Sequence, residues 1–219
     1  MSYQAIIFDM DGTLVHTEPA HCEAWLSTLA GRGFHYDEAW FAQWIGTADR
    51  ILAQAVIDEH QLTESPRELQ QIKEAKLHER LVQRNFAYPG VEAALSQLHG
   101  RLPMAIATNS SRKDVEAVFK ATPLDRYMQA VVTSDDVERL KPAPDMYLQA
   151  AEKLGVSPQH CIAVEDSPAG SKAAWDAGMY VLALTSSKPR EAMQWGHEWH
   201  HHPMEAMQRI LALSVCLKI

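Results

Sequence analysis

The sequence predicts an α/β fold, with a Rossmann-like parallel sheet as its core and a helical domain inserted into it. Strands that alternate with helices indicate a parallel sheet covered by helices on both faces. Five short apolar runs recur in this way, at Ala5–Phe8, Met104–Ala107, Ala130–Thr133, Cys161–Val164 and Tyr180–Leu184. The segment between the first two runs, residues 9–103, is far longer than a normal connection between strands and contains no comparable run.

Helical patterns fill most of that long segment. The spacing of apolar residues predicts one helix from Pro19 to about Gly33 and a second from Ala48 to His60. A third helix begins after Ser65, because Pro66 follows directly and Glu68 stands three residues on, which is a capping box with proline in the first turn. We therefore predict a helical cap domain over residues 16–86 and an α/β core over residues 1–15 and 87–219.

The bulk composition limits the classes of function. The 219 residues are 47% hydrophobic and carry a net charge of −8, with no basic run, so nucleic acid is not an expected partner. Three cysteines without a CxxC spacing favour reduced thiols and a cytoplasmic location. We expect no signal peptide and no membrane span, since no apolar run approaches the ~18 residues that a span needs.

Polar residues follow four of the predicted strands where each one ends. Ligands of parallel sheets bind at the carboxyl ends of the strands, so these residues are expected at one edge. Taken singly, each group has an ordinary explanation as a helix cap, a solvated lysine or a charged turn. The polar residues at the strand ends are Asp9 and Asp11 after the first strand, Thr108 and Asn109 after the second, Lys141 after the third, and Glu165 and Asp166 after the fourth.

This combination of groups suits phosphoryl transfer. Mg²⁺ is typically bound by oxygen ligands alone, and carboxylates supply them. A lysine, hydroxyls and backbone N–H groups can hold phosphoryl oxygens. A carboxylate can also attack phosphorus to give an aspartyl-phosphate. A second carboxyl can protonate the leaving oxygen and then activate water.

The four motifs, in this order, resemble those of the haloacid dehalogenase superfamily of Mg²⁺-dependent phosphotransferases. They are Asp9-Met10-Asp11-Gly12-Thr13, Thr108, Lys141 and Glu165-Asp166. More narrowly, the segments 17–21, 141–145 and 165–170 are similar to the β-phosphoglucomutase-like branch, which includes small sugar-phosphate phosphatases. The helical segment matches the cap of that branch in position.

The resemblance implies a role for each motif residue. Asp9 would be the nucleophile and Asp11 the general acid and base. Mg²⁺ would be held by the Asp9 side chain, the Asp11 backbone carbonyl, Asp166 and Glu165. Thr108 and Lys141 would bind the transferring phosphoryl group, with Asn109 nearby.

Some features bear on which reaction of the superfamily applies. Dehalogenase members lack the second aspartate, so Asp11 favours phosphoryl transfer over carbon–halogen cleavage. His16 stands where relatives usually carry Asp, and Leu140 where a small residue is frequent, so the local loop geometry can differ from theirs.

In the cap, three residues are candidates for substrate contact. Lys76 falls between Leu69 and Ile72 on a helical wheel, so it either snorkels at the edge of an apolar stripe or points at an anion. The resemblance favours the second alternative, because Lys76 aligns with a cap lysine that contacts substrate phosphate. His21 and Arg50 are further candidates, with hydrogen-bonded and solvated positions as their ordinary explanations. We interpret the tryptophans of the cap as packing residues and residues 195–202 as an exposed polar loop.

The sequence thus predicts an enzyme, a Mg²⁺-dependent phosphatase of a small phosphorylated metabolite such as a sugar phosphate. One alternative is a phosphomutase that uses the same site, and a remote one is a non-catalytic, receiver-like phosphorylation module. We expect a monomer or a weak homodimer.

Overall fold

The computed structural model describes residues 3–45 and 49–215 and divides the chain into two compact units. Unit 1 comprises Met1–His16 with Phe86–Ile219, and unit 2 comprises Thr17–Asn85. The predicted cap, residues 16–86, extends one residue beyond unit 2 at each end. No helix among the described residues is long and apolar enough to cross a membrane.

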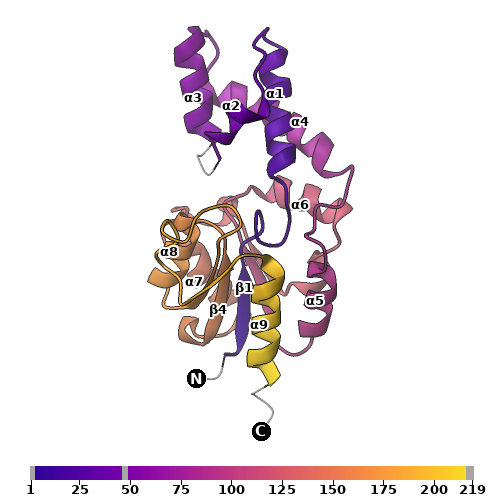
Figure 1. Ribbon diagram of the computed structural model, residues 1–219, viewed down its shortest axis with the longest axis vertical. Helices are drawn as coiled ribbons and strands as arrows, with labels where there is room; N and C mark the ends of the chain where they lie inside the picture. Colours follow the sequence, from indigo (N-terminus) through magenta and orange to yellow (C-terminus); the bar gives the residue numbers. More distant parts are fainter. Residues whose placement is uncertain (1–2, 46–48, 216–219) are drawn as a thin grey trace. The chain divides into compact units, whose positions relative to one another are not determined.

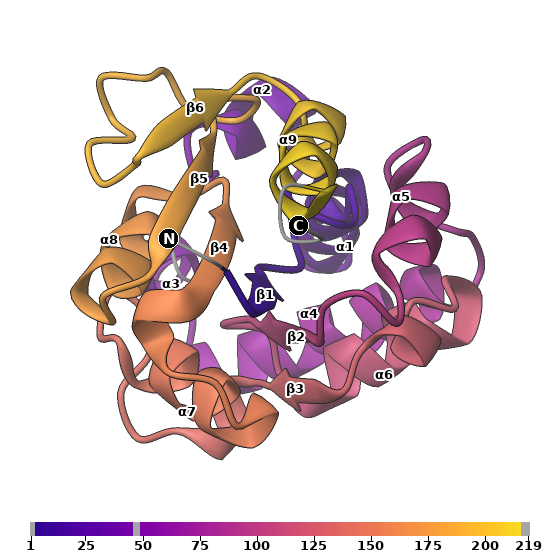
Figure 2. The same cartoon turned by 90° about the horizontal axis from the view of Figure 1, so that it is seen from below.

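The centre of unit 1 is a parallel sheet in the order β3-β2-β1-β4-β5-β6 (Figure 2). Its strands are β1 (Ala5–Phe8), β2 (Met104–Ala107), β3 (Ala130–Val132), β4 (Cys161–Glu165), β5 (Tyr180–Leu184) and β6 (Glu198–His200). The strand β1 is central, with Ile7 opposite Ala105 on one side and Ala163 on the other. All four residues of β1 are buried, as expected for a strand covered on both faces.

The sixth strand corrects the interpretation of residues 195–202 as an exposed loop. Residues 198–200 form the edge strand β6, in which Trp199 lies opposite Ala183 of β5. This segment has no apolar run, because an edge strand of three half-buried residues has no need of one. Next to β6, His197 accepts a hydrogen bond from Val181 N and stacks on Trp175.

Helices cover both faces of this sheet (Figure 1). On one face, α7 (Asp145–Leu154) packs against β1, β2 and β3, and α8 (Pro168–Asp176) packs against β4 and β5. Both helices share a core with the odd-numbered residues of β1 and β2. The helices α5 (Val91–Leu98) and α9 (Pro203–Val215) pack against each other, and α9 also contacts β5 and β6. The helix α6 (Arg112–Ala121) and the short 3-10 turns at Asp125–Tyr127, Ser134–Asp136 and Pro158–His160 complete the unit.

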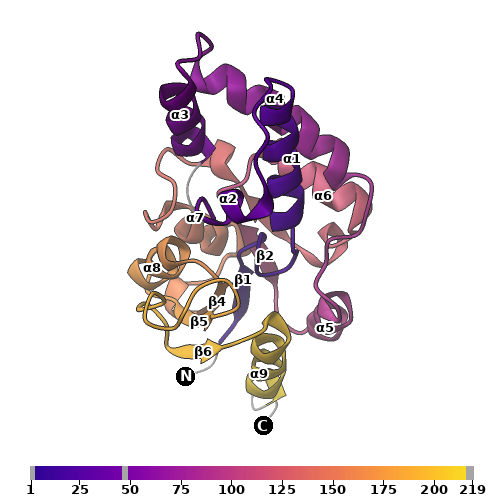
Figure 3. The same ribbon diagram turned by 45° about the horizontal axis from the view of Figure 1, so that its top comes forward.

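Unit 2 is helical throughout its described residues. Its helices are α1 (Glu18–Ala30), α2 (Glu38–Ala42), α3 (Asp49–His60) and α4 (Pro66–Leu81), and α1 and α4 lie side by side (Figure 3). The predicted capping box of Ser65 and Glu68 is confirmed at the start of α4. The start that was predicted for the second helix, Ala48, lies outside the described residues. The short helix α2 was not predicted, because five residues are too few for a periodic signal. Trp25 is fully buried in the core of this unit, and the partly buried Trp40 and Trp44 pack against this core.

The buried face of α4 differs from the predicted stripe. Leu69, Lys73, Leu77 and Leu81 are buried at four-residue spacing, whereas Ile72 is 40% exposed. The prediction was wrong on Ile72 because the next residue, Lys73, is the buried one. A lysine at that position interrupts the apolar period of the helix. The Lys73 ammonium lies 2.6 Å from Asp49 Oδ2 and 2.9 Å from His21 Nδ1.

This cluster gives a prediction about the stability of unit 2. Replacing Lys73 by Ala empties a fully buried position and leaves the Asp49 carboxylate without its cation, so we expect a loss of about 2–4 kcal/mol in the free energy of unfolding. Lys76→Ala is the matched control. Lys76 Nζ donates to Ser27 O at 2.6 Å and to Ser27 Oγ at 2.8 Å from a half-buried position, so its removal should cost about 1 kcal/mol. Urea denaturation followed by circular dichroism measures both, and equal losses would contradict the assignment of Lys73 as the buried cation.

Candidate active site

The chain turns sharply at the carboxyl end of β1, and the turn presents two aspartates. Asp9 directly follows the strand, is 7% exposed and donates its N–H to Val164 O at 2.9 Å. Gly12 has φ +81°, which a residue with a side chain rarely adopts, and its N–H bonds to Val15 O at 2.8 Å. A buried strand that ends in this turn therefore places both carboxyls at the strand tip.

A buried lysine lies among the carboxylates. Lys141 Nζ is 2.6 Å from Asp9 Oδ1 and 2.5 Å from Glu165 Oε1. Burial opposes the charged form of Lys141, but the carboxylates of Asp9 and Glu165 outweigh it and raise the pKa of the ammonium above its ordinary value. The loop that carries Lys141 is fixed by Asn109, whose Oδ1 accepts a hydrogen bond from Lys141 N at 3.1 Å.

The end of β4 supplies two further carboxylates in different environments. Glu165 is fully buried, and each of its oxygens accepts two hydrogen bonds. Asp166 is partly exposed, and its Oδ2 accepts a hydrogen bond from Ser187 Oγ at 2.9 Å. Burial, followed by the charge of Glu165, raises the pKa of Asp166 to about 7.

The end of β2 adds hydroxyl groups at the start of a helix. Thr108 is buried, and its Oγ1 accepts a hydrogen bond from Ser110 N at 3.0 Å. Ser110 Oγ donates to Asp11 Oδ2 at 2.6 Å, which ties the end of β2 to the end of β1. Ser111 then caps α6 through a capping box with Asp114, so the N-terminus of α6 lies at the same edge of the sheet.

Three of these carboxylates are arranged as a possible metal site. Ligand oxygens of Asp9, Glu165 and Asp166 all lie within 4.8 Å of one another, the one such group of three among residues 3–45 and 49–215. Burial raises the pKa of Asp9 well above its ordinary value in spite of the nearby Lys141. Three carboxylates around one ammonium leave an excess of negative charge, and an oxygen-only donor set fits a hard divalent cation. The backbone carbonyl of Asp11 as a further ligand remains a prediction.

Several residues of this edge were not found by sequence reasoning. The ends of only four strands were considered, and inspection of the segment after Leu184 would have found Ser187. Tyr147, whose hydroxyl donates to Glu165 Oε1 at 2.9 Å, gave no signal because it lies on the buried face of an amphipathic helix. Burial, followed by the charge of Glu165, raises the pKa of Tyr147 well above its ordinary value, so the hydroxyl stays a donor.

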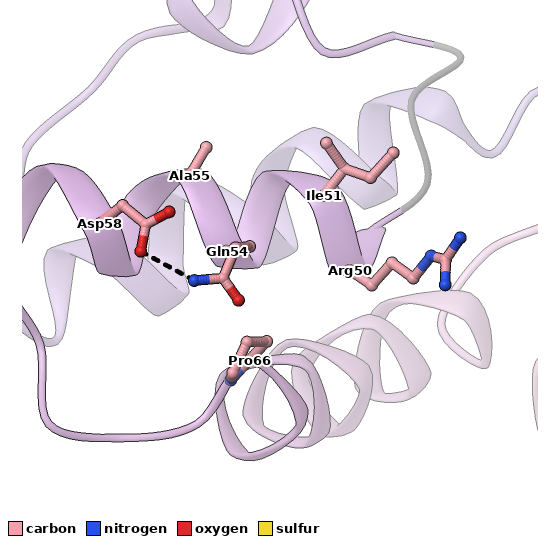
Figure 4. Close-up of a pocket in the computed structure, with 6 residues that line it drawn as sticks. All are labelled: Arg50, Ile51, Gln54, Ala55, Asp58 and Pro66. Atoms are coloured by element: carbon pink, nitrogen blue, oxygen red, sulfur yellow. Dashed lines mark hydrogen bonds between the residues drawn. The ribbon is translucent and has the colours of Figure 1, made fainter.

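The three cap candidates lie in unit 2, and their contact with substrate remains a prediction. His21 and Lys76 are engaged in the hydrogen bonds to Lys73 and Ser27 described above. Arg50 lines a pocket of about 570 Å³ on the surface of α3, together with Ile51, Gln54, Ala55, Asp58 and Pro66. Figure 4 shows this pocket, with the Gln54 amide donating to Asp58 Oδ1 at 2.8 Å.

Comparison with known proteins identifies relatives along most of the chain. A family model described as haloacid dehalogenase-like hydrolase matches residues 3–178. Fructose-1-phosphate phosphatase YqaB of Escherichia coli is 38% identical over 177 residues, covering 81% of this chain and 94% of that protein. A phosphorylated carbohydrates phosphatase of Thermotoga maritima is 32% identical over 181 residues, covering 80% and 82%. The crystal structure of a putative β-phosphoglucomutase from Thermotoga maritima is similar with a TM-score of 0.80 and 25% identity, over 95% of this chain and 99% of that chain.

The turn at Gly12 yields a prediction about metal binding. A Cβ at Gly12 would come within 2.1 Å of Asp166 Oδ2, so Gly12→Ala should displace that carboxylate and weaken Mg²⁺ binding by about tenfold or more, the loss of one good charged contact. Gly178→Ala is the matched control, because Gly178 has φ +82° but no atom within 4 Å of an added Cβ. Both variants should lose about 1–2 kcal/mol of stability from backbone strain.

Isothermal titration calorimetry with Mg²⁺ measures the difference between the two variants. Equal Mg²⁺ affinities would show that Asp166 does not take part in the site.

Proposed function

Because the chain belongs to the haloacid dehalogenase-like hydrolase family, we propose that it is a Mg²⁺-dependent phosphatase of a small phosphorylated metabolite, a sugar phosphate. One observation carries the proposal: the Asp9 carboxylate lies 2.6 Å from the buried Lys141 ammonium and within the carboxylate cluster that can hold a cation. Asp9, Asp166 and Glu165 are the side chains that would hold Mg²⁺. Once bound, the cation would supply positive charge to the phosphoryl oxygens.

The first half of the reaction transfers the phosphoryl group to Asp9. A carboxylate oxygen of Asp9 attacks phosphorus, and the bond from phosphorus to the ester oxygen breaks. Asp11 gives its proton to the departing oxygen, so the product leaves as a neutral alcohol. Lys141 and Thr108 hold the phosphoryl oxygens during the transfer. Asn109 Oδ1 keeps Lys141 in place by accepting a hydrogen bond from the Lys141 backbone N–H.

The second half releases phosphate by reversing the role of Asp11. The Asp11 carboxylate takes a proton from water, and the water oxygen attacks the phosphorus of the aspartyl-phosphate. The bond from phosphorus to the Asp9 oxygen then breaks, which restores the carboxylate and frees inorganic phosphate. The hydrogen bond from Ser110 Oγ to Asp11 Oδ2 holds the Asp11 carboxyl in place for this step.

The names of the relatives support a phosphorylated sugar or polyol as the substrate. They include a fructose-1-phosphate phosphatase and a hexitol phosphatase of Escherichia coli, the latter 34% identical over 85% of this chain and 85% of that protein. A phosphomutase remains the second candidate, supported by the similarity to the putative β-phosphoglucomutase. A receiver-like module has no need of Asp11 or of the helical insertion. A cytoplasmic location and a monomer or weak homodimer remain predictions.

A phosphatase screen tests the proposal. The protein is assayed for phosphate release from a panel of sugar, hexitol and aryl phosphates, with Mg²⁺ and with EDTA. We expect turnover of at least one sugar or hexitol phosphate with Mg²⁺ and none with EDTA. Asp9→Asn keeps the shape of the side chain but removes the nucleophile, so it should lower turnover by at least about 10³-fold, as losses of a nucleophile do.

Two results would contradict the proposal. Turnover that survives EDTA or Asp9→Asn would refute the mechanism. Rapid conversion of glucose 1-phosphate to glucose 6-phosphate with catalytic glucose bisphosphate, and little free phosphate, would favour the mutase.

A further inference from the structure

Glu165 is the most tightly held carboxylate of the site. Its Oε1 accepts hydrogen bonds from Lys141 Nζ and Tyr147 OH, and its Oε2 accepts from Ser167 N at 3.0 Å and Ser167 Oγ at 2.9 Å. A Cβ at Gly170 would come within 1.7 Å of Oε1, so the carboxylate is also packed closely against the start of α8. Four donors and this contact fix the carboxylate in one orientation.

Tyr147 touches both members of the Glu165–Lys141 pair. Its side chain is fully buried on α7, and its hydroxyl donates to the same oxygen that receives the Lys141 ammonium. The Lys141 Nζ also lies 5.1 Å from the centroid of the Tyr147 ring, within the range of a cation–π contact. Tyr147 therefore contacts the ammonium directly through its ring and restrains it indirectly through Glu165 Oε1.

We propose that Tyr147 is a positioning residue, which acts through Glu165 to aim the Lys141 ammonium at the phosphoryl-binding position beside Asp9. Without the hydroxyl, Glu165 Oε1 loses one of its two donors and can rotate toward the remaining one, carrying Lys141 with it. A buried acceptor that loses a partner has a strong drive to reorganise. The inference rests on the proposed function, because it assigns Lys141 to the phosphoryl group.

The test measures inorganic phosphate binding, so that it does not depend on turnover. Tyr147→Phe keeps the ring and its packing and removes only the hydroxyl. With saturating Mg²⁺, calorimetry should show phosphate binding weakened about tenfold, which corresponds to one hydrogen bond to a charged group. The KM for an aryl phosphate should rise by a similar factor.

Tyr180→Phe is the matched control. The Tyr180 hydroxyl also donates to a glutamate, Glu198 Oε1, at 2.9 Å, but it lies at the amino end of β5, away from the carboxyl ends of the strands. This variant should bind phosphate as the wild type does. Tyr147→Met loses the ring as well as the hydroxyl, so it should bind phosphate more weakly than Tyr147→Phe.

A double-mutant cycle with Glu165→Gln separates positioning from a general loss of stability. Because Glu165 would also hold Mg²⁺, each variant is measured at a Mg²⁺ concentration that saturates it. If Tyr147 acts through Glu165, the effect of Tyr147→Phe on phosphate affinity should largely disappear in the Glu165→Gln background. Independent, multiplying effects would overturn the proposal, as would wild-type phosphate affinity in Tyr147→Phe. A wild-type protein that neither binds phosphate nor hydrolyses any ester would instead overturn the proposed function, and this inference with it.

Discussion

The buried ammonium of Lys141 is the interaction on which the rest of the site depends. Three carboxylates at the ends of β1 and β4 could not be brought within 4.8 Å of one another in a buried place without a compensating cation. Lys141 contacts two of them, Asp9 and Glu165, and supplies one positive charge for three carboxylates. The lysine thus makes the cluster possible without balancing its charge, and the remaining negative charge is what a divalent cation would compensate.

The fold supplies this arrangement through the register of its central strands. Phe8 pairs with Ile106 and with Val164, so the chain leaves β1, β2 and β4 at the same level of the sheet. Asp9, Thr108 and Glu165 follow these three residues directly or after one further position. Close packing then fixes the details, since neither Gly12 nor Gly170 has room for a side chain beside the carboxylates. The helical unit is built on a separate core around Trp25 and Leu69 and does not take part in this register.

The sequence predicted the features that depend on local pattern. The strand runs at Ala5–Phe8, Met104–Ala107 and Tyr180–Leu184 coincide with β1, β2 and β5, because buried parallel strands are continuous apolar runs. The edge strand β6 was missed because it has no such run. On α4, Lys73 in the buried face broke the hydrophobic period, which led to Ile72 being placed there instead. Tyr147 could not be found from pattern, since its role depends on its side-chain rotamer and on a contact between distant segments.

The most direct test of the account is the identity of the group that carries the phosphoryl. In Asp11→Asn, an aryl phosphate can still transfer its phosphoryl group because the leaving group needs no proton, but the base that activates water is lost. The protein should therefore accumulate a phosphoenzyme, and mass spectrometry after an acid quench should locate one phosphoryl group on the peptide that contains Asp9. A phosphoryl group on any other residue, or turnover of this variant at the wild-type rate without an intermediate, would contradict the assignment of Asp9 as the nucleophile.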